Sequence, residues 1–140
     1  MLGTLEFDHP LGLLGHSDGD VVAHAICDAM LAASGGPDIG GMFPPGDPAW
    51  AGASGERLLG LVRDRLTEEG HRLVNVHAIV VCERPKVGPH RAAMAARIAE
   101  ILELPVSRCS VKATTTEGLG FTGRSEGLAA QAVATVMMPA

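Results

Sequence analysis

The run of residues 73–82, Leu-Val-Asn-Val-His-Ala-Ile-Val-Val-Cys, limits the possible folds of this chain more than any other segment. It is too short and too rich in valine for a surface helix, and β-branched residues favour extended backbone. Its second half is apolar almost without interruption, which is typical of a central strand covered on both faces. The chain therefore needs further strands beside this one and helices to cover it.

Three segments have the apolar spacing of helices. The first begins near residue 18, with Ser17 as its N-cap, and ends at Gly35-Gly36-Pro37. The second runs from Ser54 to Gly70, and the third covers about residues 89–104. Further strands are expected at residues 109–113 and 128–138, although the second of these also fits a helix, and residues 5–7 could end a strand or form a hairpin arm. The pattern predicts an α+β fold, with a mixed four-stranded sheet and helices packed on one face.

Length and charge narrow the class of protein. The 140 residues are 46% hydrophobic and 19% charged, which predicts one globular domain over residues 1–140. No apolar run is long enough to cross a membrane, and the first ten residues do not form a signal peptide, so we expect a cytoplasmic protein. The net charge of -5 argues against nucleic acid as a partner but allows a small phosphorylated ligand. Three widely spaced cysteines (Cys27, Cys82 and Cys109) are expected to be buried free thiols.

The stretch from His16 to His24, His-Ser-Asp-Gly-Asp-Val-Val-Ala-His, combines a helix start with chemically active side chains. His16 and Ser17 come just before the first turn, where free amides and the helix dipole attract phosphate. Asp20 and His24 are four residues apart and share one helix face. This end of the helix could bind an anion and a metal, but a plain helix start with a packed histidine explains these residues equally well.

The segment from Lys112 to Arg124, Lys-Ala-Thr-Thr-Thr-Glu-Gly-Leu-Gly-Phe-Thr-Gly-Arg, carries the strongest chemical signal. Three consecutive hydroxyls, a carboxylate that can bind Mg²⁺, and an arginine that can bridge phosphate oxygens suit a nucleotide diphosphate with a divalent cation. An ordinary Thr/Gly turn with a surface ion pair is the alternative.

Two other loops are weaker candidates. Residues 82–88 follow the central strand, where open α/β sheets bind ligands, although a plain connector with a solvated Lys86 is the more frequent case. Residues 37–55 are rich in Gly and Pro and are interpreted as a ligand flap, in which Asp38, Phe43 and Asp47 could contact sugar hydroxyls and a methyl group. Surface turns of this composition are common. No role is assigned to Asp8, His9 or the histidines beyond residue 70.

Together these segments resemble one family, the 2-C-methyl-D-erythritol 2,4-cyclodiphosphate synthases of non-mevalonate isoprenoid biosynthesis. The resemblance rests on motifs in matching order and spacing: Gly12-Leu-Leu-Gly-His-Ser-Asp-Gly-Asp, Asp38-Ile-Gly, Phe43-Pro, Arg84-Pro-Lys86, Val111-Lys-Ala-Thr-Thr-Thr-Glu-Gly-Leu-Gly-Phe-Thr-Gly-Arg124 and Glu126-Gly127. It implies a lyase that closes 4-diphosphocytidyl-2-C-methyl-D-erythritol 2-phosphate to the cyclic diphosphate and releases CMP. It also implies a homotrimer with sites between subunits.

The resemblance further implies roles for individual residues. His24 would bind Zn²⁺ or another divalent cation, Glu117 would bind Mg²⁺ or Mn²⁺, and His16 and Thr115 would be catalytic. The substrate would be held by three groups: a cytidine pocket of Cys82, Arg84, Pro85, Lys86, Val87, Gly88, Ala113, Thr114, Thr115 and Thr116; a sugar site of Asp38, Ile39, Gly40, Phe43 and Asp47; and a phosphate end of Ser17, Glu117, Phe121 and Arg124.

The sequence departs from the family at one point. The family's two other zinc ligands come from an Asp-x-His motif on a leading strand, and the chain begins after the position where that strand is expected. Asp8-His9 is not this motif, so we expect His24 alone to bind zinc weakly. Two functions remain open: an active synthase, and a truncated, catalytically silent paralogue that binds cytidine nucleotides. A metal-dependent phosphohydrolase is the third possibility if the resemblance misleads.

Overall fold

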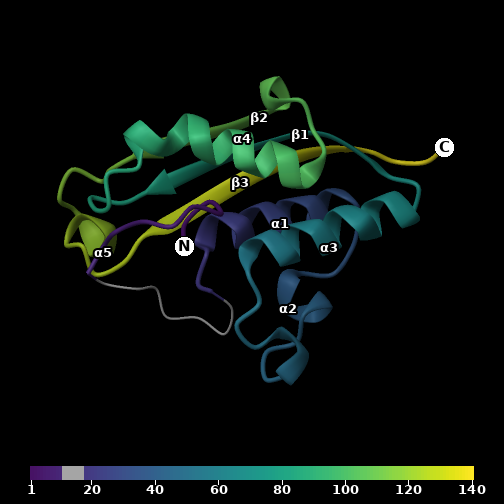
Figure 1. The fold of residues 1–140 in the computed structure, drawn as a ribbon, viewed down its shortest axis with the longest axis horizontal. Coiled ribbons are helices and arrows are strands. Elements are labelled where there is room, and N and C mark those ends of the chain that lie inside the picture. Colours follow the sequence, from purple (N-terminus) through teal and green to yellow (C-terminus); the bar gives the residue numbers. More distant parts are fainter. Residues whose placement is uncertain (11–17) are drawn as a thin grey trace.

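The computed structural model describes residues 1–10 and 18–140, and its centre is a mixed sheet (Figure 1). The strands β1 (Arg72–Val81), β2 (Cys109–Thr114) and β3 (Ala129–Met137) lie in the order β2-β1-β3. β1 runs parallel to β2 and antiparallel to β3. The Val-rich run therefore forms the central strand, as predicted, and the last apolar run is a strand.

The prediction of four strands is wrong for the described residues, which form three. Residues 5–7 join no sheet, and the N-terminal segment contributes only an isolated bridge between Leu2 and Leu5. Leu2 and Leu5 pair across a two-residue turn in which Gly3 and Thr4 have positive φ angles of 56° and 65°. The amides of Gly3 and Thr4 donate to the carboxylate of Asp20, at 2.8 and 2.6 Å, which attaches this turn to the start of α1.

The three predicted long helices are α1 (Val21–Ala33), α3 (Gly55–Glu68) and α4 (Arg91–Leu102). The first begins later than expected, because its N-cap is Asp20, whose carboxylate accepts from the amides of Val22 and Ala23. Gly19 has a φ of 77° and cannot belong to the helix. Ser17, the predicted cap, lies outside the described residues. The described part of the chain also contains short helices: α2 (Ile39–Met42), α5 (Gly120–Gly123) and three 3₁₀ turns at Pro48–Trp50, Gly88–His90 and Val106–Arg108.

Helices cover one face of the sheet, as predicted. Val76, Ala78 and Val80 on β1 are buried under them, whereas the alternate residues of β3, such as Val133 and Met137, are exposed on the other face. α1 and α3 lie side by side along the sheet, and α4 packs against β2 (Figure 1). Among the described residues no helix has the length and apolar character needed to cross a membrane. The three cysteines are free and buried, as predicted.

The topology brings three segments to one end of the sheet. Val81, the last residue of β1, is paired with both Thr114, the last residue of β2, and Ala129, the first of β3. Residues 82–88, residues 115–124 and the approach to β3 therefore lie at the same end, which Figure 1 shows beside α5.

Candidate active site

Two of the predicted site loops lie together at this end of the sheet. The amide of Cys82 donates to the carbonyl oxygen of Thr114 at 3.1 Å. The amide of Gly118 donates to the carboxylate of Glu83 at 3.4 Å. The loop of residues 82–88 and the loop of residues 114–124, which we call the threonine loop, are thus joined by hydrogen bonds, although they are about thirty residues apart in the chain.

The three threonine hydroxyls have different partners. That of Thr114 is 3.5 Å from the Thr115 carbonyl oxygen, at the limit of a hydrogen bond. That of Thr115 donates to the Glu117 carboxylate and accepts from the Glu117 amide, both at 3.2 Å. That of Thr116 donates to the Leu119 carbonyl oxygen at 2.5 Å and shares a hydrogen bond of 2.9 Å with Thr122. Thr114 is therefore the most available to a ligand.

Arg124 already has an anionic partner. Its Nε and Nη2 atoms donate to the two carboxylate oxygens of Glu126 at 2.9 and 3.0 Å, which raises the pKa of the Arg124 guanidinium. Both side chains are more than half exposed, at 58% and 57%. Phe121 is also exposed. A phosphate that binds Arg124 in a fork through Nε and Nη2 has to replace Glu126, whereas this ion pair leaves the two Nη1 protons and the second Nη2 proton unused.

The loop of residues 82–88 alternates between buried and exposed side chains. Cys82 and Val87 are buried, while Arg84 and Lys86 are exposed. Burial, aided by the nearby Glu83 carboxylate and opposed by Lys86, raises the pKa of the Cys82 thiol. The thiol therefore stays protonated. It donates to the Pro85 carbonyl oxygen at 3.5 Å, a contact within the same loop.

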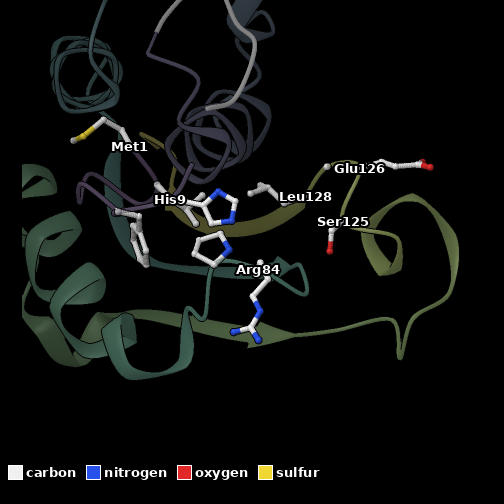
Figure 2. Close-up of a pocket in the computed structure, with 10 residues that line it drawn as sticks. Met1, His9, Arg84, Ser125, Glu126 and Leu128 are labelled. Carbon is white, nitrogen blue, oxygen red and sulfur yellow. The ribbon is translucent and has the colours of Figure 1, made fainter. Parts of the chain in front are cut away.

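A cavity of about 290 Å³ opens beside this loop (Figure 2). Arg84 and Pro85 form one side, and the N-terminal segment with Met1, Leu2, Phe7 and His9 forms another. Residues 125–128 line the remaining part of the cavity. Phe7 is fixed there by an edge-on contact with the His90 ring, with centroids 4.8 Å apart.

The other predicted site residues form a separate group. His24 is half-buried in the first turn of α1, and its amide donates to the Asp20 carbonyl oxygen at 3.0 Å. Asp38 caps α2 and Asp47 caps the turn at Pro48–Trp50, while Phe43 is buried against Trp50. Figure 1 shows α2 well away from α5, so one chain does not bring residues 38–47 to the threonine loop. His16 lies outside the described residues.

Comparison with known proteins identifies the family. The sequence matches the YgbB family over residues 1–137. The chain belongs to this family. It is 60% identical over 131 residues to a bifunctional enzyme IspD/IspF from Paramagnetospirillum magneticum, covering 94% of this chain and 34% of that protein. It is 54% identical over 135 residues to one from Rhodopseudomonas palustris strain TIE-1, covering 96% and 34%. This YgbB-family chain therefore spans about a third of the length of these relatives.

Solved structures of the same family have the same fold. A bifunctional IspDF from Campylobacter jejuni matches with a TM-score of 0.91 and 40% identity, over 97% of this chain and 37% of that one. A 2C-methyl-D-erythritol-2,4-cyclodiphosphate synthase in its CDP-bound form matches with a TM-score of 0.88 and 35% identity, over 98% and 89%. An IspF from Plasmodium falciparum in complex with CDP matches with 0.76 and 30%, over 90% and 75%. The resemblance in the sequence motifs is thereby confirmed.

The resemblance implies two separate ions, one at His24 and one at Glu117. Residues 1–10 and 18–140 contain no group of three His, Cys, Asp or Glu side chains placed to hold an ion. The described residues therefore do not give His24 the three protein ligands that a catalytic zinc site uses. A Mg²⁺ ion at Glu117 would need fewer protein ligands, because this ion takes water and substrate phosphate oxygens.

Three side chains near the site were not predicted from the sequence: Glu83, Thr122 and Glu126. Thr122 and Glu126 bind the predicted residues Thr116 and Arg124, and Glu83 accepts from the amide of Gly118 in the threonine loop. Thr122 and Glu126 lie within or beside a recognised motif, but nothing in their spacing indicates which group they bind. Their partners are set by how the threonine loop folds back on itself.

Proposed function

We propose that this protein converts 4-diphosphocytidyl-2-C-methyl-D-erythritol 2-phosphate to 2-C-methyl-D-erythritol 2,4-cyclodiphosphate and CMP, as a phosphorus–oxygen lyase in the cytoplasm. The observation that carries the proposal is the match to a CDP-bound cyclodiphosphate synthase over 98% of this chain and 89% of that one. The two loops joined at one end of the sheet support it, because they supply hydroxyls, cations and backbone groups for a nucleotide diphosphate. The buried free thiols are consistent with a reducing compartment.

The proposed reaction is an intramolecular phosphoryl transfer. An oxygen of the 2-phosphate attacks the β-phosphorus, and the bond from that phosphorus to the oxygen bridging to the CMP phosphate breaks. CMP leaves with the electron pair of that bond, and no water is consumed. Such a reaction needs mainly positioning and neutralisation of charge.

In this proposal the described residues position the substrate and neutralise its charge, and none of them forms a covalent intermediate. The cytidine lies against residues 82–88 and Thr114, and Thr115 donates to the reacting phosphate once its hydroxyl leaves the Glu117 carboxylate. Arg124 exchanges Glu126 for phosphate oxygens. His16 and Ser17 are assigned to the phosphate by the resemblance alone, and Asp38, Ile39, Gly40, Phe43 and Asp47 to the sugar.

We further propose that the site is completed between copies in a homotrimer. Two observations support this. Residues 38–47 and the threonine loop lie apart in one chain, although both are assigned to one substrate. The uncovered face of the sheet also exposes Val133 and Met137, at 65% and 53%, which suits burial against another copy.

Zn²⁺ at His24 and Mg²⁺ or Mn²⁺ at Glu117 remain predictions from the resemblance. The described residues do not supply a complete protein ligand set around His24, and a cation at Glu117 would take its remaining ligands from water and the substrate's phosphates. Metal content after dialysis, together with CDP affinity measured with and without each cation, tests both assignments.

The test of function is to incubate the protein with the diphosphocytidyl substrate and follow cyclic product by ³¹P NMR and CMP by chromatography. Equal amounts of both products are expected, with strong loss in Thr115→Val and retention in Thr115→Ser. CDP binding without CMP release would instead identify a silent cytidine-nucleotide binder. Release of inorganic phosphate from unrelated esters, with no cyclic product, would identify a phosphohydrolase.

A further inference from the structure

We propose that Thr122 is a positioning residue, which holds the threonine loop in its ligand-binding shape through the hydroxyl of Thr116. In this assignment the Thr116 hydroxyl is part of the loop's framework and does not bind substrate. The inference rests on the proposed function for its effect on nucleotide binding, but the contacts that carry it are internal to the chain.

The direction of the hydrogen bonds follows from counting protons. A threonine hydroxyl has one proton to donate and two lone pairs to accept with. The Thr116 hydroxyl uses its proton on the Leu119 carbonyl oxygen. In the 2.9 Å contact between the two hydroxyls, Thr122 must therefore be the donor and Thr116 the acceptor.

Thr122 is built into the loop more firmly than its neighbours. It is 4% exposed, whereas Phe121 beside it is 52% exposed. A buried hydroxyl left without a partner is costly, so Thr122 favours the one conformation in which Thr116 lies within reach. The bond links the residue before Glu117 to a residue within α5, across the intervening turn.

Close backbone packing closes the same turn. A Cβ atom on Gly123 would lie 2.2 Å from the carbonyl carbon of Gly118, so only glycine fits there. Gly118 itself has a φ of 80°, in the left-handed region that favours glycine. The amide of Leu119 donates to the Thr116 carbonyl oxygen at 3.1 Å, and that of Gly123 to the Leu119 carbonyl oxygen at 3.2 Å. The turn is therefore one compact unit with the two hydroxyls at its base.

The groups assigned to the substrate branch directly from this unit. Thr115 precedes Thr116, Glu117 follows it with a φ of 53°, and Arg124 comes two residues after Thr122. Loss of the hydroxyl pair would let these three side chains shift together. A misplacement of about 1 Å in a positioning group can cost on the order of 100-fold in rate.

The test compares Thr122→Val, which keeps the shape and removes the hydroxyl, with Thr122→Ser, which keeps the hydroxyl. CDP affinity is measured by calorimetry, and kcat and KM are measured with the diphosphocytidyl substrate. Amide hydrogen exchange is measured over residues 114–126. Thr122→Val should weaken CDP binding about tenfold, as expected for a lost buried hydrogen bond, and speed exchange in the loop. Thr122→Ser should stay within about threefold of the wild type in both measurements.

Thr116→Val separates positioning from direct binding. Thr116→Val removes the link to Thr122 and also the hydrogen bond to the Leu119 carbonyl oxygen. If the Thr116 hydroxyl is framework, any further loss of CDP affinity in Thr116→Val should be matched by faster exchange of the loop, and the double variant should bind no more weakly than Thr116→Val alone. A loss beyond that of Thr122→Val with no faster exchange would show that this hydroxyl contacts the ligand and would overturn the proposal. Wild-type exchange and CDP affinity in Thr122→Val would overturn it too.

The exchange experiment also keeps this inference separate from the proposed function. If the wild type neither binds CDP nor forms cyclic product, the proposed function fails, while the exchange comparison still decides whether Thr122 holds the loop. If Thr122→Val does not fold, the half-buried Thr116→Val gives the same comparison of exchange, and unchanged exchange there overturns the proposal.

Discussion

Replacement of Asp20 by alanine should remove more stability than any ordinary helix cap does. Asp20 is fully buried, and its carboxylate accepts four amide hydrogen bonds. Two come from the start of α1, from Val22 at 3.2 Å and Ala23 at 3.0 Å. The other two come from Gly3 at 2.8 Å and Thr4 at 2.6 Å, and they attach the N-terminal turn to the helix.

The expected loss follows from these contacts. Removal of an N-cap costs about 1 kcal/mol, and each buried amide left unpaired costs about 1 to 3 kcal/mol. Because Gly3 and Thr4 are buried and lose their acceptor together, Asp20→Ala should lower the free energy of unfolding by about 3 to 7 kcal/mol. Asp20→Asn keeps one oxygen but turns an NH₂ group toward an amide, and should cost about 1 to 3 kcal/mol.

Urea denaturation followed by circular dichroism measures these differences. Ser54→Ala is the matched control, since Ser54 is an exposed N-cap that accepts only the Arg57 amide, at 3.1 Å. It should lose about 0.5 to 1 kcal/mol. If Asp20→Ala costs no more than Ser54→Ala, Asp20 is an ordinary cap and its long-range amide bonds contribute nothing.

Three further predictions test other parts of the chain. In α3, Gly60→Ala should stabilise the protein by about 1 kcal/mol, because the new Cβ would meet open space. Gly55→Ala should destabilise the protein, because the new Cβ would lie 2.7 Å from the Cβ of Ala23. Thermal melting compares the two variants. Burial raises the pKa of Cys109 from 9.0 to about 11, so the thiol of the unfolded chain deprotonates first as the pH rises. The free energy of unfolding should therefore fall between pH 9 and 11, and it should fall less steeply in Cys109→Ala. Urea titrations at each pH measure the difference. Glu126→Gln should free Arg124 and tighten CDP binding about two- to fivefold by calorimetry; unchanged affinity would mean that Arg124 does not reach the phosphate.

The sheet and long helices could be predicted because their signals are local. The apolar spacing of α1, α3 and α4 and the β-branched run of β1 are visible in short windows of sequence. The errors arose where a distant group decides the local structure. Ser17 fits the sequence rule for a cap, but the backbone turn at Gly19 gives that role to Asp20. The same carboxylate binds the amides of Gly3 and Thr4, a long-range contact that no short window of sequence indicates.

The loops of the candidate site and the convergence of two of them were predictable, but the position of α2 relative to these two loops was not. The parallel pairing of β1 with β2 brings residues 82–88 to the threonine loop, and that follows from strands that end at one edge. The separation of α2 from this edge does not follow from the sequence, because it depends on the path of residues 37–54. Likewise, three adjacent threonines look equivalent in sequence, yet each hydroxyl has its own partner.

The free threonine loop is satisfied largely by its own carboxylates. Thr115 donates to Glu117, and Arg124 is held by both oxygens of Glu126. A diphosphate therefore exchanges hydrogen bonds here and adds few new ones, so its affinity depends on the difference between a phosphate and a carboxylate as acceptor. A phosphate carries more charge than one carboxylate and is therefore the stronger acceptor for Arg124. It replaces Glu126 favourably only if the arginine is already in place and does not have to move. The hydroxyl pair of Thr116 and Thr122 and the close packing of Gly118 and Gly123 should resist such movement, so in the proposed assignment these internal contacts contribute to affinity by holding Arg124 in place.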